Sequence, residues 1–140
     1  MSRFQQLPLL TDLQATRRAT PKPSTRLSRA IAKKAARLLD LQQLRAWSFA
    51  VKDRDQWKDR KTGVKVRSTR QLDPLRAEAH HIVSRDDKAV RTDVRNGLCL
   101  SFATHDAVTR GQYRIEGTVF FKKGGATYID ATFPVIFVRL

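Results

Sequence analysis

The chain has 140 residues and a formal net charge of +15, so it is long enough for one ordinary domain, or for a smaller domain with an arm. Its one cysteine, Cys99, excludes an internal disulfide framework and a four-cysteine zinc site. No apolar run reaches membrane-spanning length and no secretory signal is recognisable, so we expect a cytoplasmic protein without a membrane partner.

The basic charge is concentrated in the first half of the chain. Residues 1–76 carry 19 Lys and Arg against 6 acidic residues, whereas residues 77–140 carry 9 against 7. An excess of this size favours a polyanionic partner, and nucleic acid is the commonest one for a basic protein. The alternative is a charge excess that only confers solubility.

Residues 1–25 are expected to form a basic, flexible arm. Pro21 and Pro23 fix their own φ angles and disfavour helix before them, so this stretch should be extended. Its cations suit sliding contact with phosphates, although a disordered tail that only stays solvated is the alternative.

The composition of residues 26–47 predicts a basic amphipathic helix, because good helix formers dominate and Ser24 or Thr25 can cap it. An apolar face is expected to pack on the core, and it consists of Leu27, Ile31, Leu38 and Leu41. The basic stripe beside it is expected either to contact a nucleic acid backbone or to stay solvated, and it consists of Arg26, Arg29, Lys33 and Arg37.

All three histidines lie between residues 78 and 111. They occur in Glu78-Ala79-His80-His81-Ile82 and Thr104-His105-Asp106-Ala107, with Arg95-Asn96-Gly97-Leu98 between. In residue type, order and spacing this segment resembles the HNH nuclease motif on its ββα-metal core. Periodicity predicts strands at 78–84 and 97–102, a variable loop between them, and a helix at 103–110 that ends at Gly111.

The resemblance implies a metal-dependent endonuclease that hydrolyses DNA phosphodiester bonds. By this resemblance, His80 and His105 hold one divalent metal ion and His81 is the general base that activates water. Asn96 would tie the loop between the strands and so orient His81. Consecutive strand residues point to opposite faces, which suits different tasks for His80 and His81.

The resemblance also indicates which metal ion the site would hold. Many HNH proteins carry another ligand four residues after the last motif histidine, where this chain has Thr109. Two imidazoles completed by water and phosphate oxygens favour weakly held Mg²⁺ or Mn²⁺, and they leave Zn²⁺ and Ni²⁺ open.

A zinc knuckle accompanies the motif in many HNH proteins, and this chain cannot form one. If Arg54-Asp55 matches the start of that knuckle, its four cysteine positions are Trp57, Arg60, Ser101 and Thr104. We expect Trp57 to pack into the space and to help hold the two halves together.

The remaining segments complete an α+β fold: an HNH core preceded by the basic helix and followed by a C-terminal antiparallel β extension at 112–140. Residues 26–140 are treated as a single nuclease domain. A turn and short strand are expected at 61–66, and Lys123-Gly124-Gly125 predicts a hairpin in a sheet whose aromatic residues belong to the core.

Several functional alternatives remain open. Arg85 and Arg110 flank the motif and either contact the phosphate or are solvated charges. The chain could instead be a non-catalytic basic DNA- or RNA-binding protein on a decayed HNH core, or a nuclease toxin domain with an acidic partner. A monomer and a homodimer are both compatible with the sequence.

Overall fold

A computed structural model describes residues 25–140, so the arm expected over residues 1–25 lies, apart from Thr25, outside the described residues. Contacts divide the chain into two compact units, Met1–Ala36 and Arg37–Leu140. The described part of the first unit is the beginning of helix α1, Arg26–Arg54. The second unit contains the rest of α1 and every other element.

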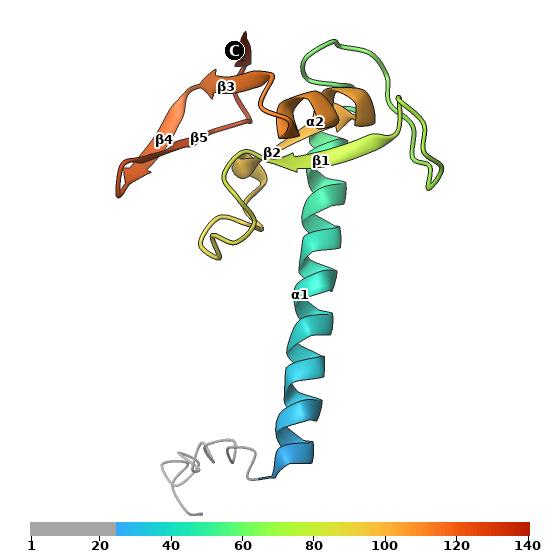
Figure 1. Cartoon of the computed structure of the whole chain (residues 1–140), viewed down its shortest axis with the longest axis vertical. Helices are drawn as coiled ribbons and strands as arrows, with labels where there is room; N and C mark the ends of the chain where they lie inside the picture. The colour runs from blue at the N-terminus through green and yellow to red at the C-terminus, as the bar shows by residue number, and fades with distance from the viewer. Residues whose placement is uncertain (1–24) are drawn as a thin grey trace, which may run out of the picture. The chain divides into compact units, whose positions relative to one another are not determined.

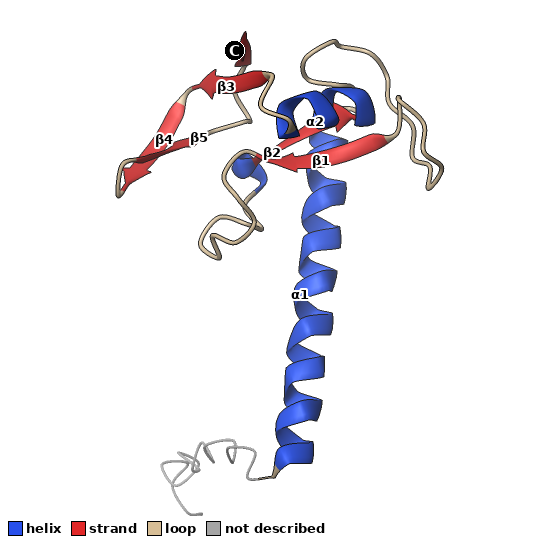
Figure 2. Ribbon diagram, in the orientation of Figure 1, coloured by secondary structure: helices blue, strands red, loops and turns tan. Residues whose placement is uncertain are grey.

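The fold class is α+β, as predicted. The described residues form two α-helices, a short 3-10 helix and six strands (Figures 1 and 2). After α1 these are β1 Ala77–His81, η2 Val94–Asn96, β2 Gly97–Ser101, α2 Phe102–Thr109, β3 Tyr113–Gly117, β4 Val119–Lys123, β5 Ala126–Ile129 and β6 Val135–Arg139. The strands pair antiparallel as β1–β2, β3–β6 and β4–β5. The order strand, strand, helix expected between residues 78 and 111 is therefore present.

Helix α1 is longer than predicted and leaves its apolar face exposed. It continues past Trp47 to Arg54, because no Gly or Pro interrupts it, and it ends where Gln56 and Trp57 adopt positive φ angles. Thr25 caps it, with its hydroxyl accepting from the Ser28 N–H at 3.1 Å. The expectation that its Leu face packs on the core is wrong, since the exposed residues include Leu27, Ile31, Leu38 and Leu41. The buried residues of α1 are Trp47 and Val51.

The β1–β2 pair forms the centre of the second unit. Leu98 and Leu100 of β2 are fully buried in a cluster with Ala131, whereas Cys99 points into a second cluster with Val66 and Ala77. These alternating residues define the two faces of the pair. Figure 1 shows α2 beside β1 and β2, directly after the second strand.

The C-terminal extension consists of two separate strand pairs and not of one continued sheet. Gly117 ends β3, and a register shift between Val119 and Phe121 disturbs the start of β4. The hairpin predicted at 123–125 joins β4 to β5, with Gly124 and Gly125 at φ angles of 57° and 81°. The expected core role of the aromatic residues holds for Tyr128, which is buried, but not for Phe133, which is 51% exposed.

The segment between α1 and β1 differs from the prediction. The short strand predicted within residues 61–66 is replaced by isolated bridges, Lys58 to Lys65 and Arg67 to Arg76. Neither helix in residues 25–140 combines the length and the apolar character needed to cross a membrane.

Candidate functional site

His80 and His105 face each other across the β1–α2 junction. The centroids of the two imidazole rings are 5.2 Å apart and the ring planes are inclined by 74°. Two imidazoles that share one ion, at about 2.1 Å from metal to nitrogen, have centroids roughly 4.5–5.5 Å apart for ligand angles of about 90–110°. The centroid separation of the pair therefore lies within the range that a shared metal ion would give.

The environment of His80 favours its neutral form. Burial is the main cause and the charges of His105 and His81 add to it, so the pKa of His80 falls to about 4. A neutral imidazole has a free lone pair, which is the form that binds metals. His80 thus keeps its ligand atom available throughout the neutral pH range.

His81 points to the opposite face of β1, as the alternation of a strand predicts. Its ring stacks on the Trp47 indole with centroids 3.8 Å apart and planes inclined by 10°. Its Nε2 lies 2.8 Å from the carbonyl oxygen of Arg91. Because a carbonyl only accepts, Nε2 carries the proton in the neutral ring, and Nδ1 is left as a proton acceptor. Burial lowers the pKa of His81, and the charge of Arg85 acts in the same direction.

Asn96 ties together the loop that follows β1. Its side chain is buried, and its Oδ1 accepts from the Val83 N–H at 2.7 Å. Its Nδ2 donates to the carbonyls of Val83 and Val90 at 3.0 and 3.3 Å. Arg91, whose carbonyl accepts from His81, follows directly after Val90. These contacts are the loop tie expected for Asn96, reached through the backbone and not through the His81 ring.

Trp47 is a site residue that the sequence reasoning missed. Besides stacking on His81, its Nε1 donates to the Asp93 carbonyl at 2.9 Å. Gly97 lies opposite His81 in the β1–β2 register, and a Cβ atom there would come within 2.6 Å of Trp47 and Val51. The Asn96-Gly97 pair carried a signal, because a glycine inside a strand often marks the close approach of another group.

His80 and His81 of β1 line a pocket of about 510 Å³. Ile82, Ser84, Val108 and residues of β3 and β5 also line it.

Among the cations predicted to bind phosphate, Arg110 is paired with Asp106 at 3.1 Å on the exposed side of α2. Arg85 and Arg37 line other pockets of the second unit, while Arg26, Arg29 and Lys33 are exposed on the first unit. Glu78, two residues before His80, pairs with Arg76 at 2.7 Å.

Asp59 is fully buried, and its carboxylate joins the turn after α1 to Ser101 at the end of β2. One carboxylate oxygen accepts from the Lys61 and Thr62 N–H groups at 2.7 and 3.1 Å, and the other accepts from the Ser101 N–H at 2.9 Å. Burial raises the pKa of the Asp59 carboxyl group, but hydrogen bonds from Thr104 and Ser101 outweigh it, so the net pKa is lowered. Ser101 also caps α2 by accepting from the Thr104 N–H.

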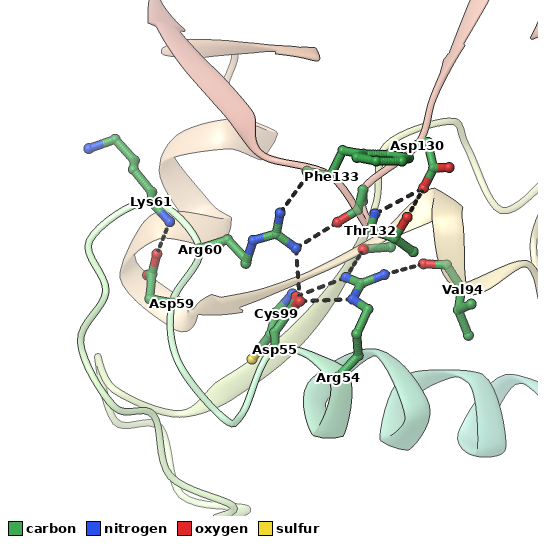
Figure 3. Close-up of polar contacts among 12 residues, drawn as sticks. Arg54, Asp55, Asp59, Arg60, Lys61, Val94, Cys99, Asp130, Thr132 and Phe133 are labelled. Carbon is green, nitrogen blue, oxygen red and sulfur yellow. Dashed lines mark hydrogen bonds and ion pairs between the residues drawn. The ribbon is translucent and has the colours of Figure 1, made fainter. Parts of the chain in front are cut away.

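Asp55 organises a second set of contacts beside Asp59 (Figure 3). Its carboxylate accepts from Arg54, from Arg60 and from the Cys99 N–H, all within 2.8–2.9 Å. Arg54 also donates to the Val94 and Gly97 carbonyls at 2.6 Å, and Arg60 to those of Ala131 and Phe133 at 2.7 and 2.9 Å. Trp57 packs against Val66, Ala77 and Cys99 as predicted, but these two carboxylates make the polar connections.

The chain matches no protein-family model, and neither the curated proteins nor the solved structures contain a detectable relative. In the part of the chain that the structure describes, no group of three or more His, Cys, Asp or Glu side chains is arranged to hold a metal ion. Any functional conclusion therefore depends on the chemistry of the residues themselves.

Proposed function

We propose that this protein is a metal-dependent endonuclease that hydrolyses DNA phosphodiester bonds on an HNH-type ββα-metal core. The observation that carries the proposal is the facing pair of His80 and His105 at 5.2 Å, beside a separately oriented His81. A purely structural role would not require two histidines at the end of β1, a third in α2 that faces His80, and a buried Asn96 that fixes the loop after β1. The net charge of +15 supports a polyanionic substrate.

In the proposed reaction His81 acts as the general base. The Arg91 carbonyl fixes the proton on Nε2, so Nδ1 takes a proton from a water molecule in the adjoining pocket. The water oxygen then bonds to phosphorus, and the bond from phosphorus to the 3′ oxygen breaks in line with it. The lowered pKa of His81 keeps the ring neutral before the reaction, and the Trp47 stack limits its rotation.

His80 and His105 would hold the divalent ion, with Mg²⁺ or Mn²⁺ favoured and Zn²⁺ or Ni²⁺ open. When bound, such an ion supplies positive charge that stabilises the phosphate and the departing 3′ oxygen. Thr109, one turn after His105, supplies no third imidazole, so water and phosphate oxygens would complete the coordination. The role of Asn96 is to position His81 by holding the loop that contains the Arg91 carbonyl.

The proposal is tested by cleavage of supercoiled plasmid with Mg²⁺, Mn²⁺, Ni²⁺ or Zn²⁺, or with a chelator. We expect the native protein to nick or linearise DNA only with metal, and His81→Ala and His105→Ala to bind DNA without cutting it. Arg70→Gln is a matched control, because it removes one exposed positive charge outside the histidine site and should cut DNA as the native protein does. If no metal supports cleavage while all the proteins bind DNA in a salt-dependent way, the chain is a binding protein on a decayed core.

A further inference from the structure

A second pocket lies on the flank of α1 within the Arg37–Leu140 unit, separate from the one that contains His80 and His81. It has a volume of about 400 Å³, and we call it the α1 pocket. Its lining includes Arg45, Phe49, Lys52, Trp57 and Arg85. Arg45, Phe49 and Lys52 recur at helical spacing and so share one face of α1. The volume falls within the range of about 300–1,000 Å³ that is typical of ligand pockets.

The charge of the α1 pocket has one sign. Three of its lining residues are cations, and none of its other lining residues is acidic. Among residues 25–140, none of Arg45, Lys52 and Arg85 takes part in an ion pair. Three cations around one open pocket, with no carboxylate among its described lining residues, favour an anionic ligand.

Aromatic rings give the α1 pocket a second property. Phe49 is 61% exposed and meets Trp57 edge to face, with centroids 6.1 Å apart. The Lys52 ammonium lies 5.8 Å from the centroid of the Trp57 ring. Exposed aromatic rings bind unpaired bases by stacking, whereas the base faces of a duplex are already covered by their neighbours.

The α1 pocket continues into a neighbouring pocket of about 350 Å³, with which it shares Leu41, Leu44 and Arg85. The neighbouring pocket adds the cations Arg37, Lys88 and Arg91. It also adds Asp86 and Asp40, the latter paired with Arg91. Arg91 is the residue whose carbonyl holds His81. The neighbouring pocket contains four cations and two carboxylates, so a surface with net positive charge leads from the aromatic pair toward the candidate general base.

From this combination we infer that the α1 pocket binds an unpaired nucleotide of single-stranded DNA, with its base against Phe49 and its phosphates on Arg45, Lys52 and Arg85. The inference rests on the proposed function and deepens it, because it names DNA with unpaired nucleotides, and not uniform duplex, as the preferred substrate. An acidic peptide would satisfy the cations equally well but would leave the aromatic pair without a role.

The test is fluorescence anisotropy of labelled DNA with chelator present, so that no cleavage occurs. We expect the native protein to bind a short single strand more tightly than a blunt duplex at the same salt. Phe49→Ala should weaken single-strand binding by about 5- to 100-fold and leave duplex binding unchanged. Arg45→Gln should reduce the slope of log K against log salt for the single strand by about 0.7.

Phe133→Ala is the matched control, because Phe133 is 51% exposed and its described hydrogen bonds are made by its backbone N–H and carbonyl groups, which the substitution retains. Equal binding of duplex and single strand, or equal losses for Phe49→Ala and Phe133→Ala, would overturn the inference. So would polyglutamate that displaces the strand equally well from the native protein and from Phe49→Ala.

The outcomes separate the inference from the proposed function. A single-strand preference that depends on Phe49 without metal-dependent plasmid cleavage would retain the pocket and reject the nuclease. Cleavage that depends on His81 without any such preference would retain the nuclease and reject the pocket.

Discussion

The histidine site and the cluster around Asp55 and Asp59 are attached to the same β1–β2 pair, but they differ in how strictly their residues are specified. In the first, the proposed chemistry needs particular atoms, namely imidazole nitrogens at fixed places on β1 and α2. In the second, the task is to connect segments, and the buried carboxylates do so by accepting hydrogen bonds from the Cys99 and Ser101 N–H groups of β2. A connecting task can be met by different chemistry, whereas a reaction restricts the residue types.

The two regions also differ in the free energy needed to bury their polar groups. The buried carboxylates of Asp55 and Asp59 would be strongly unfavourable alone, because they are desolvated. Each is surrounded by hydrogen-bond donors, and in the described residues no buried side-chain polar atom lacks a partner. A fully satisfied polar cluster specifies one arrangement of its segments, so removal of a single member should be expensive.

The largest effect is expected from His81→Ala on cleavage. Loss of a general base reduces the rate by about 10²- to 10⁴-fold, while stability changes little because only the Trp47 stack and one hydrogen bond are lost. Single-turnover plasmid nicking with metal and thermal unfolding measure the two quantities. Partial recovery of the rate of His81→Ala by added imidazole is also expected. A variant that cuts at the native rate would contradict the assignment of His81.

Asp59→Asn should have the opposite effect to His81→Ala: a large loss of stability and little direct effect on the chemistry of cleavage. It replaces one acceptor oxygen by a donor that faces backbone N–H groups, so we expect a loss of about 2–4 kcal/mol in the free energy of unfolding. Urea denaturation measures it, with Asp53→Asn on the exposed surface of α1 as control. Equal stability of the two variants would show that the cluster does not hold the segments together.

Acid should weaken the native protein more than Asp59→Asn. The folded-state pKa of Asp59 is lowered, so its contribution to stability is present above the unfolded pKa of about 3.9 and is lost as the pH falls toward the folded pKa. The free energy of unfolding of the native protein should therefore decrease more steeply below about pH 4. Asp87 and Asp93 also have lowered pKa values, but both proteins retain them, so the difference between the proteins isolates Asp59.

The smallest effect is expected from a chelator on stability. The residues that the HNH resemblance would align with a zinc knuckle are Trp57, Arg60, Ser101 and Thr104, and none of them binds zinc as a thiolate does. EDTA should abolish cleavage and leave the unfolding temperature unchanged, as calorimetry can test. A lower unfolding temperature with EDTA in His105→Ala, which lacks the proposed metal site, would mean that another metal ion stabilises the fold, against the role assigned to the carboxylates.

The sequence by itself determined the strand, strand, helix order around the histidines, because period-two alternation and the glycine that ends the helix, Gly111, are local signals. It also predicted that His80 and His81 face opposite sides of β1. Local patterns were less informative for α1, whose apolar face implied packing that the structure does not contain. Amphipathic spacing describes a helix surface but does not say what covers it.

Only the tertiary structure decided which distant residues complete the two regions. Trp47 is 34 residues before His81, and Asp59 is 42 residues before Ser101, so no local pattern links them. Their contacts depend on how α1 and the turn after it are folded against β2. The order of the histidines is a property of one segment, whereas the stack on His81 and the carboxylate cluster arise where separate segments meet.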